Sequence, residues 1–314
     1  TSDAARELRD HPVAADRLLE RRFGARLRRD PPMARLYDLK VARWSRTPDP
    51  GLALKWERWL ESKMLRLAVL KAGYDGIHRD NVESDSSSHP DRVGNCISGM
   101  PVEITREGWP AAEHSMLRRL RTKVSEAGFG SRPLIINHIR AAEPEISRLY
   151  LREVEGANTE GWLSRDRPYD GPFGWKASVD QAAEVAASGK KLTLICKTDS
   201  VSAEESLYLF SSYLLAHDGK HLYFFHGSSY RPEATRWHDF YDLDIGSPVE
   251  PARDAGGLYV RKFSRGLVAV NPFEVAGTLA VPEGYVRPAG EKVRSFTLGP
   301  HSAVILTLSE GTAG

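Results

Sequence analysis

Residues 191–229 read KLTLICKTDSVSAEESLYLFSSYLLAHDGKHLYFFHGSS, and this stretch decides the fold class. The short apolar runs at 191–196 and 221–225 are typical of buried strands. Between them, residues 204–216 carry apolar side chains at helical spacing. A strand, a helix and a second strand in this order form a unit whose two strands are parallel, so the stretch predicts an α/β protein.

The same alternation extends along the chain from about residue 35 to residue 230. Strands are expected near residues 36, 77, 135, 151, 194 and 223, and helices over 52–71, 111–127, 179–188 and 204–216. The strand Leu149–Val154 is expected to end at Glu155. This alternation predicts a parallel sheet, either a barrel or a doubly wound sheet. No Gly-x-Gly-x-x-Gly segment opens a helix and no Walker loop is present, which disfavours a nucleotide-binding fold.

The sequence changes character after about residue 245. Short alternating segments separated by Gly and Pro turns follow, among them 259–263, 266–271 and 303–308, and they predict antiparallel strands. We therefore expect a (β/α)8 TIM-barrel type domain over residues 1–245, followed by a C-terminal antiparallel, sandwich-like β domain over residues 246–314.

Composition narrows the classes of partner. The 314 residues include 44 Lys and Arg against 42 Asp and Glu, and this near balance argues against nucleic acid as the main partner. No apolar run reaches the length of a membrane span. Cys96 and Cys196 are too few for a disulfide scaffold or a zinc cluster, and they form either one bridge or two buried thiols. The sequence given begins at Thr1 rather than Met and shows no signal peptide, which leaves a processed or trimmed N-terminus open. The compartment, secreted or cytoplasmic, and the oligomeric state stay open as well.

Acidic residues at predicted strand ends are the candidates for chemistry. Function in parallel α/β sheets collects at the carboxyl ends of the strands, and these ends include Asp80, Asn137 and Glu155. Cleavage of a glycosidic bond needs one carboxylate that attacks or activates water and a second carboxyl that protonates the leaving oxygen. Asp80 and Glu155 are therefore the predicted catalytic pair, with Glu160 in the same loop as the competitor of Glu155. Each acid also has a simpler interpretation, since a strand-end Asp followed by Asn can cap a loop.

Neighbouring polar and aromatic residues complete the predicted site. His78 lies on the same side of its strand as Asp80, either as a hydrogen-bonding support or as a core histidine. Asn81 and Asn137 are candidates to bind sugar hydroxyls. Candidates to stack on sugar faces, with plain packing as the alternative, are Tyr74, Trp162, Trp175 and Tyr230. The histidines lack ligand spacing, and the predicted chemistry requires no metal or cofactor.

Four segments together resemble a known family. They are GYDGIHRDNV (73–82), LIINHI (134–139), YLREVEGANTEGW (150–162) and the long stretch WHDFYDLDIGSPVEPARDAGGLYVRKFSRGLVAVNP (237–272). They resemble the hypothetical glycosyl hydrolase 15-like family, whose members are TIM-barrel proteins. The resemblance implies that the strand-four Asp of the family falls on Asp80 and that its later strand-end Glu falls on Glu155, with Glu160 as the fallback. Family barrels have eight strands, whereas about six are counted here, so the first two strand–helix units are expected to be missing.

The resulting prediction is a glycoside hydrolase that cleaves an oligo- or polysaccharide with two carboxylates. Asp80 is expected to be the nucleophile or, in an inverting enzyme, the base, and Glu155 the general acid with a raised pKa. The alternative from another class is a non-catalytic carbohydrate-binding or scaffold protein on a degraded barrel. A second enzymatic alternative is a glycosyl-transferring barrel that uses the same two acids.

Overall fold

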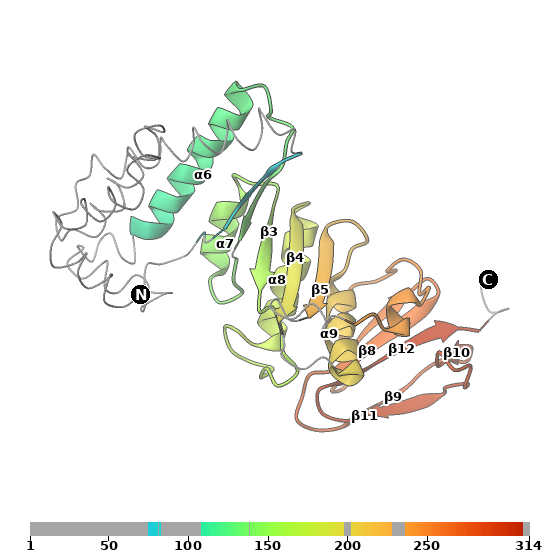
Figure 1. Ribbon diagram of the computed structural model, residues 1–314. Helices are drawn as coiled ribbons and strands as arrows, with labels where there is room; N and C mark the ends of the chain where they lie inside the picture. The colour runs from blue at the N-terminus through green and yellow to red at the C-terminus, as the bar shows by residue number, and fades with distance from the viewer. Residues whose placement is uncertain are drawn as a thin grey trace, which may run out of the picture. The chain divides into compact units, whose positions relative to one another are not determined.

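The computed structural model describes residues 75–80, 82, 108–137, 139–197, 202–227 and 236–309 (Figure 1). The chain divides into two compact units. One unit comprises residues 1–77 and 83–134, and the other comprises residues 78–82 and 135–314.

Helix α6 (Gly108–Glu126) is the main described element of the first unit. Leu117, Leu120 and Val124 recur at helical spacing and are at most 2% exposed, so they form the apolar face of the helix. The helix stops before Gly128, whose φ of +84° lies in the left-handed region that suits a glycine after a helix. The expected helix over 111–127 is confirmed.

Five strands form one sheet. They are β1 (Ile77–Arg79), β2 (Leu134–Asn137), β3 (Gly156–Glu160), β4 (Lys191–Lys197) and β5 (Leu222–Gly227). Their order in the sheet is the order along the chain, and the ladders from β2 to β5 are parallel. A doubly wound sheet reverses its strand order partway, whereas a barrel adds each strand on the same side. The winding is therefore of barrel type, and five strands of such a barrel lie among the described residues.

Helices cover one face of this sheet. They are α7 (Pro144–Leu151), α8 (Trp175–Ala187) and α9 (Ala203–Ala216), and Figure 1 shows them beside the strands. Along β4, Leu192, Leu194 and Cys196 are fully buried, whereas Thr193 and Ile195 between them are only half-buried. The first set faces the helices, and the second set lies on the opposite face. No helix in the described part of the chain is long and apolar enough to cross a membrane.

The predicted strand over Leu149–Val154 is wrong. Helix α7 occupies Pro144–Leu151, and the next strand, β3, begins only at Gly156. Ser147, Tyr150 and Leu151 are buried at spacings of three and four residues, which is a helical pattern. The concentration of apolar residues between Leu149 and Val154 conceals this pattern in the sequence. Pro144 in the first turn also suits a helix start. The helix expected over 52–71 and the strand expected near residue 36 lie outside the described residues.

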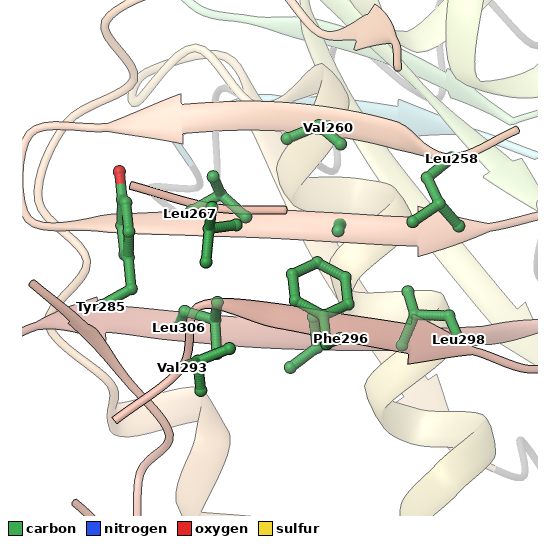
Figure 2. Packing of buried hydrophobic residues seen from close by; sticks show 11 residues of the cluster. Leu258, Val260, Leu267, Tyr285, Val293, Phe296, Leu298 and Leu306 are labelled. Atoms are coloured by element: carbon green, nitrogen blue, oxygen red, sulfur yellow. The ribbon is translucent and has the colours of Figure 1, made fainter. Parts of the chain in front are cut away.

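The C-terminal part is antiparallel, as predicted. A short 3-10 helix, η5 (Asp239–Asp242), precedes strands β6 (Arg253–Asp254), β7 (Tyr259–Phe263), β8 (Gly266–Asn271), β9 (Gly277–Ala280), β10 (Tyr285–Val286), β11 (Ser295–Leu298) and β12 (Ser302–Leu308). One sheet has the order β10-β12-β8-β7-β6, and β9 pairs with β11 in a second. Figure 2 shows the apolar cluster of this part, in which Val260, Leu267, Phe296, Leu298 and Leu306 lie together.

Helix α9 joins the parallel sheet to the antiparallel one. It packs against β5 on one side and against β7, β8 and β12 on the other. Strand β8 is buried along its whole length, because Leu267 and Ala269 belong to the apolar cluster while Val268 and Val270 are also fully buried. The Arg261 side chain of β7 donates to carbonyl oxygens at the end of α9, including those of Leu215 and His217, so it satisfies groups that a helix end leaves open. The domain boundary expected between residues 245 and 246 stays a prediction.

Candidate active site

Four side chains meet where neighbouring parallel strands end. Asp80 follows β1, and Asn137, Glu160 and Lys197 are the last residues of β2, β3 and β4. The Asn137 amide nitrogen donates to Asp80 Oδ1 at 2.8 Å and to Glu160 Oε1 at 3.1 Å. The Lys197 ammonium donates to Glu160 Oε2 at 2.5 Å. Parallel strands carry their carboxyl ends to one edge of a sheet, and this topology brings together residues up to 117 positions apart, from Asp80 to Lys197.

Asn137 is the centre of the group. Its side chain is 6% exposed, and both of its carboxylate contacts require the NH2 group, so the orientation of the amide is defined by its partners. Its Oδ1 is buried without a hydrogen-bond partner among the described residues. The Asn137 carbonyl also accepts a hydrogen bond from the Val82 backbone at 2.7 Å, which ties the chain just after Asp80 to β2.

Glu160 is held in its ionised form. The hydrogen bond from Lys197 is the largest cause that lowers the pKa of Glu160 below its ordinary value, and partial burial opposes it. The charge of Lys197 and the hydrogen bond from Asn137 lower this pKa further, whereas the charge of Asp80 raises it. The Lys197 and Glu160 side chains are 34% and 36% exposed, so solvent screens part of their attraction.

A second polar contact joins His78 and Asn158, which precede Asp80 and Glu160 by two residues each. The Asn158 side-chain nitrogen is 2.9 Å from His78 Nε2. Asn158 precedes Glu160 by two residues on the same face of β3, and its register partner in β2 is Asn137. His78 precedes Asp80 by two residues in the same way, and its side chain is exposed. His78 therefore contacts Asn158, and its role at the acidic site stays a prediction.

Glu155 does not lie with this group. It precedes β3, and its carbonyl accepts a hydrogen bond at 2.9 Å from the backbone nitrogen of Lys191, the first residue of β4. That contact lies at the amino ends of the strands. The expectation that a strand ends at Glu155 is wrong because helix α7 occupies that segment, and Glu160 takes the strand-end position instead.

The aromatic candidates have mixed outcomes. Trp162 is 2% exposed, and its indole nitrogen donates to the Ser178 carbonyl at 3.1 Å. Trp175 is fully buried and donates to Ser212 Oγ at 2.9 Å. Both rings are part of the packing between sheet and helices, which is the alternative that the sequence left open. Tyr74, Asn81, Cys96 and Tyr230 lie outside the described residues, and Cys196 is a free, buried thiol.

A small cavity of about 110 Å³ opens beside Glu160. Its lining includes Arg140, Arg167, Phe173 and Gln181. Arg167 donates to the Phe173 carbonyl at 2.8 Å and to the Gly161 carbonyl at 3.0 Å, so it closes the loop that follows β3. Sequence reasoning missed both Arg167 and Lys197. The signal for Lys197 was a cation at the end of a buried strand, next to a strand that ends in an acid.

The fold and the site define an α/β protein of barrel-type winding with two carboxylates joined at its strand ends. The chain belongs to the hypothetical glycosyl hydrolase family 15, whose sequence model matches residues 54–267. The expected membership of this family is thereby confirmed. The matched region contains all five parallel strands and reaches into β8.

Several solved structures match the chain at low identity and low TM-score. A beta-porphyranase of glycoside hydrolase family 86 from Bacteroides plebeius is 13% identical over 71% of this chain, with a TM-score of 0.37, and the match covers 55% of its length. The trehalulose synthase of Pseudomonas mesoacidophila is 12% identical over 83% of this chain and 69% of its own, with a TM-score of 0.40. An alpha-amylase from Geobacillus thermoleovorans is 11% identical over 84% of this chain and 65% of its own, with a TM-score of 0.38. No curated protein matches the chain.

Proposed function

We propose that this protein hydrolyses a glycosidic bond in an oligo- or polysaccharide, with Asp80 and Glu160 as its two catalytic carboxyl groups. The observation that carries the proposal is the shared hydrogen-bond donor, Asn137, which holds one oxygen of each acid. Membership of a glycosyl hydrolase family supports the reaction class. Glu160 replaces Glu155 in this assignment because Glu160 lies at the carboxyl end of β3.

The spacing of the two acids favours retention of anomeric configuration. Asp80 Oδ1 and Glu160 Oε1 are at most about 6 Å apart, because they lie 2.8 Å and 3.1 Å from the same nitrogen. Retaining glycosidases separate their carboxyl groups by about 5–5.5 Å, whereas inverting enzymes need roughly 6.5–9.5 Å to admit a water. A double displacement through a covalent glycosyl–enzyme intermediate fits the shorter spacing.

The remaining polar groups have roles consistent with sugar binding. The unpartnered Asn137 Oδ1 accepts hydrogen bonds only, so a sugar hydroxyl that reaches it would donate. Asn158 and His78 lie one step along the same face and present further polar atoms. The open face of β4 and β5 continues from this group and carries Tyr223 and Phe225, which are 48% and 40% exposed. Aromatic surface of this kind suits the apolar face of a sugar ring.

A hydrolysis assay tests the proposal. The purified chain is incubated with a panel of 4-nitrophenyl glycosides and of polysaccharides, and release of nitrophenol or reducing ends is followed. We expect turnover by the wild type and a loss of about 10³-fold or more in Asp80→Asn and Glu160→Gln, since each removes an acid–base or nucleophilic group.

Glu155→Gln is the matched control, because it makes the same chemical change five residues away at the other end of β3. It is expected to keep wild-type turnover. The proposal fails if Glu160→Gln is as active as Glu155→Gln, and sugar binding without turnover by the wild type would instead support the non-catalytic scaffold.

A further inference from the structure

We propose that Lys197 is a positioning residue that keeps Glu160 as the anionic carboxylate, so that Glu160 attacks the sugar and Asp80 protonates the leaving oxygen. This inference rests on the proposed function and divides the two roles within the pair. It reverses the roles expected from the sequence, in which Asp80 is the nucleophile or, in an inverting enzyme, the base.

The first observation is that both oxygens of Glu160 have a donor. Asn137 holds Oε1 at 3.1 Å, and Lys197 holds Oε2 at 2.5 Å. Two donors on different strands restrict rotation of the carboxylate, so one oxygen keeps a defined direction toward the shared site. Of the two donors, only Lys197 brings a positive charge.

The second observation is that the strand register enforces this contact. Glu160 is the register partner of Ile195 in the β3–β4 ladder, and Lys197 follows Ile195 by two residues. Residues two apart on a strand share a face, so the Lys197 side chain leaves the sheet on the same face as Glu160. The register therefore brings the Lys197 ammonium within hydrogen-bonding distance of the Glu160 carboxylate.

The third observation concerns protonation. A proton on Glu160 would remove the charge attraction to Lys197, and a general acid must carry its proton before the reaction. The described charged groups around Glu160 are Lys197 from β4, Asp80 from the end of β1, and Arg140 and Arg167 in the lining of the adjoining cavity. Three of these four are cations. The low pKa of Glu160 agrees with this balance of charge.

The reaction then balances as two displacements. In the first, a Glu160 oxygen bonds to the anomeric carbon while the glycosidic C–O bond breaks, and the proton of Asp80 goes to the leaving oxygen. In the second, the Asp80 carboxylate takes a proton from water, the water oxygen bonds to the anomeric carbon, and the ester bond to Glu160 breaks. Lys197 forms no bond to the substrate in either step.

Side-chain carboxyl NMR tests the role of Lys197 without any substrate. The full chain is labelled with ¹³C at glutamate carboxyls, Glu160→Gln assigns the Glu160 signal, and the titration is compared in wild type, Lys197→Met and Lys197→Arg. We expect the midpoint of Glu160 to rise by about one pH unit in Lys197→Met and to return toward the wild-type value in Lys197→Arg. High salt should raise the wild-type midpoint as well, because the pair is partly exposed, and this measurement needs no variant. An unchanged midpoint in Lys197→Met, or a salt-insensitive one in the wild type, overturns the inference.

Covalent trapping tests the division of roles. The wild type is treated with a panel of activated 2-deoxy-2-fluoro glycosides, and the labelled peptide is identified by mass spectrometry. A label on Glu160 supports the inference, and a label on Asp80 overturns it while leaving the hydrolase proposal intact. If the Glu160 midpoint depends on Lys197 but no sugar in any assay is turned over, the proposed function fails and the positioning contact stands.

Discussion

Two buried asparagines, Asn271 and Asn137, show how differently the two sheets use the same residue. Asn271 ends strand β8 and is fully buried. Its side-chain nitrogen donates to three backbone carbonyls, those of Val275, Leu298 and Gly299, and its Oδ1 accepts from the Phe273 backbone. Every partner is a neutral backbone group, so the amide joins the turn after β8 to the end of β11 and leaves no polar atom unpaired.

Asn137 has the opposite surroundings. Its nitrogen bridges two carboxylates, and its oxygen is buried without a partner among the described residues. Two like charges beside one amide, together with an unpaired acceptor, do not favour folding. Such arrangements are typical of sites that interact with a ligand. The antiparallel sheet therefore uses its asparagine for stability, whereas the asparagine of the parallel sheet lies in the site that we propose for chemistry.

The contrast also bears on the longest of the four segments that resemble the family. The segment from Trp237 to Pro272 contains Arg261, which caps helix α9, and Asn271, which closes the turn after β8. Gly246 in this segment has a φ of +74°, and a Cβ there would lie 2.0 Å from Ser264 Oγ. These residues hold the junction of the two sheets together, so the segment identifies the fold more directly than it identifies the reaction.

The largest change in stability is expected for Asn271→Ala. The substitution takes the shared partner away from three carbonyls, of which that of Leu298 is buried, and from one backbone nitrogen, so we expect the free energy of unfolding to fall by about 3 kcal/mol. Chemical denaturation followed by circular dichroism measures this change. Thr278→Ala is the control. It removes an exposed contact between the hydroxyls of Thr278 on β9 and Thr297 on β11, and it should cost less than about 0.5 kcal/mol. Equal losses in the free energy of unfolding for the two variants would show that the Asn271 side chain does not stabilise the antiparallel part.

The next effect concerns acid stability at the ends of the parallel strands. Burial is the main cause that lowers the pKa of His226 from 6.5 to about 4, with the charge of His238 as a smaller cause. Neither ring nitrogen has a partner among the described residues. Because the unfolded chain takes up this proton first, stability is complete above pH 6.5 and is lost as the pH falls toward 4.

His226→Gln removes this titration. Between pH 8 and pH 4.5, the variant should lose roughly 2 kcal/mol less of its free energy of unfolding than the wild type does. Denaturation curves at both pH values measure the difference, and the comparison at pH 8, where the imidazole is neutral in both states, supplies the reference. Identical pH slopes for the two proteins would show that His226 takes up its proton in the folded chain as readily as in the unfolded chain.

The smallest effect on stability is expected for Asn137→Ala. The amide contributes two hydrogen bonds but also leaves a buried oxygen unpaired, so the free energy of unfolding should change by less than about 1 kcal/mol. Hydrolysis, measured as described for the catalytic variants, should fall about 10²-fold because the two acids lose their common donor. A loss of stability as large as that of Asn271→Ala would assign Asn137 a structural role instead.

Much of the architecture was predictable because it depends on local patterns. Buried strands such as β4 appear as apolar runs, and the apolar residues of α9 recur with a helical period. The C-terminal strands appear as short segments of alternating apolar and polar residues, separated by Gly and Pro turns. The exception is Leu149–Val154, where the apolar residues fit both periods. Only the packing of Tyr150 and Leu151 into the core, together with Pro144 at the helix start, selects a helix there.

The site was only half predictable, because its residues were chosen from the expected ends of strands. Asp80 and Asn137 were candidates because each stands at the end of a clear strand, and Glu160 was the competitor of Glu155. The misassigned helix shifted the next strand end by five residues, from Glu155 to Glu160. Lys197 was missed because its importance comes from a partner on another strand.

The sequence by itself determined the α/β class, the parallel order of strands and helices, the antiparallel C-terminal part and the family. Periodicity and short motifs carry this information, and they act over a few residues. Only the tertiary structure decided that Asp80, Asn137, Glu160 and Lys197 meet, and that Glu155 lies at the opposite end of its strand. The physical reason is strand register, since alignment of neighbouring strands decides which distant side chains come within hydrogen-bonding distance.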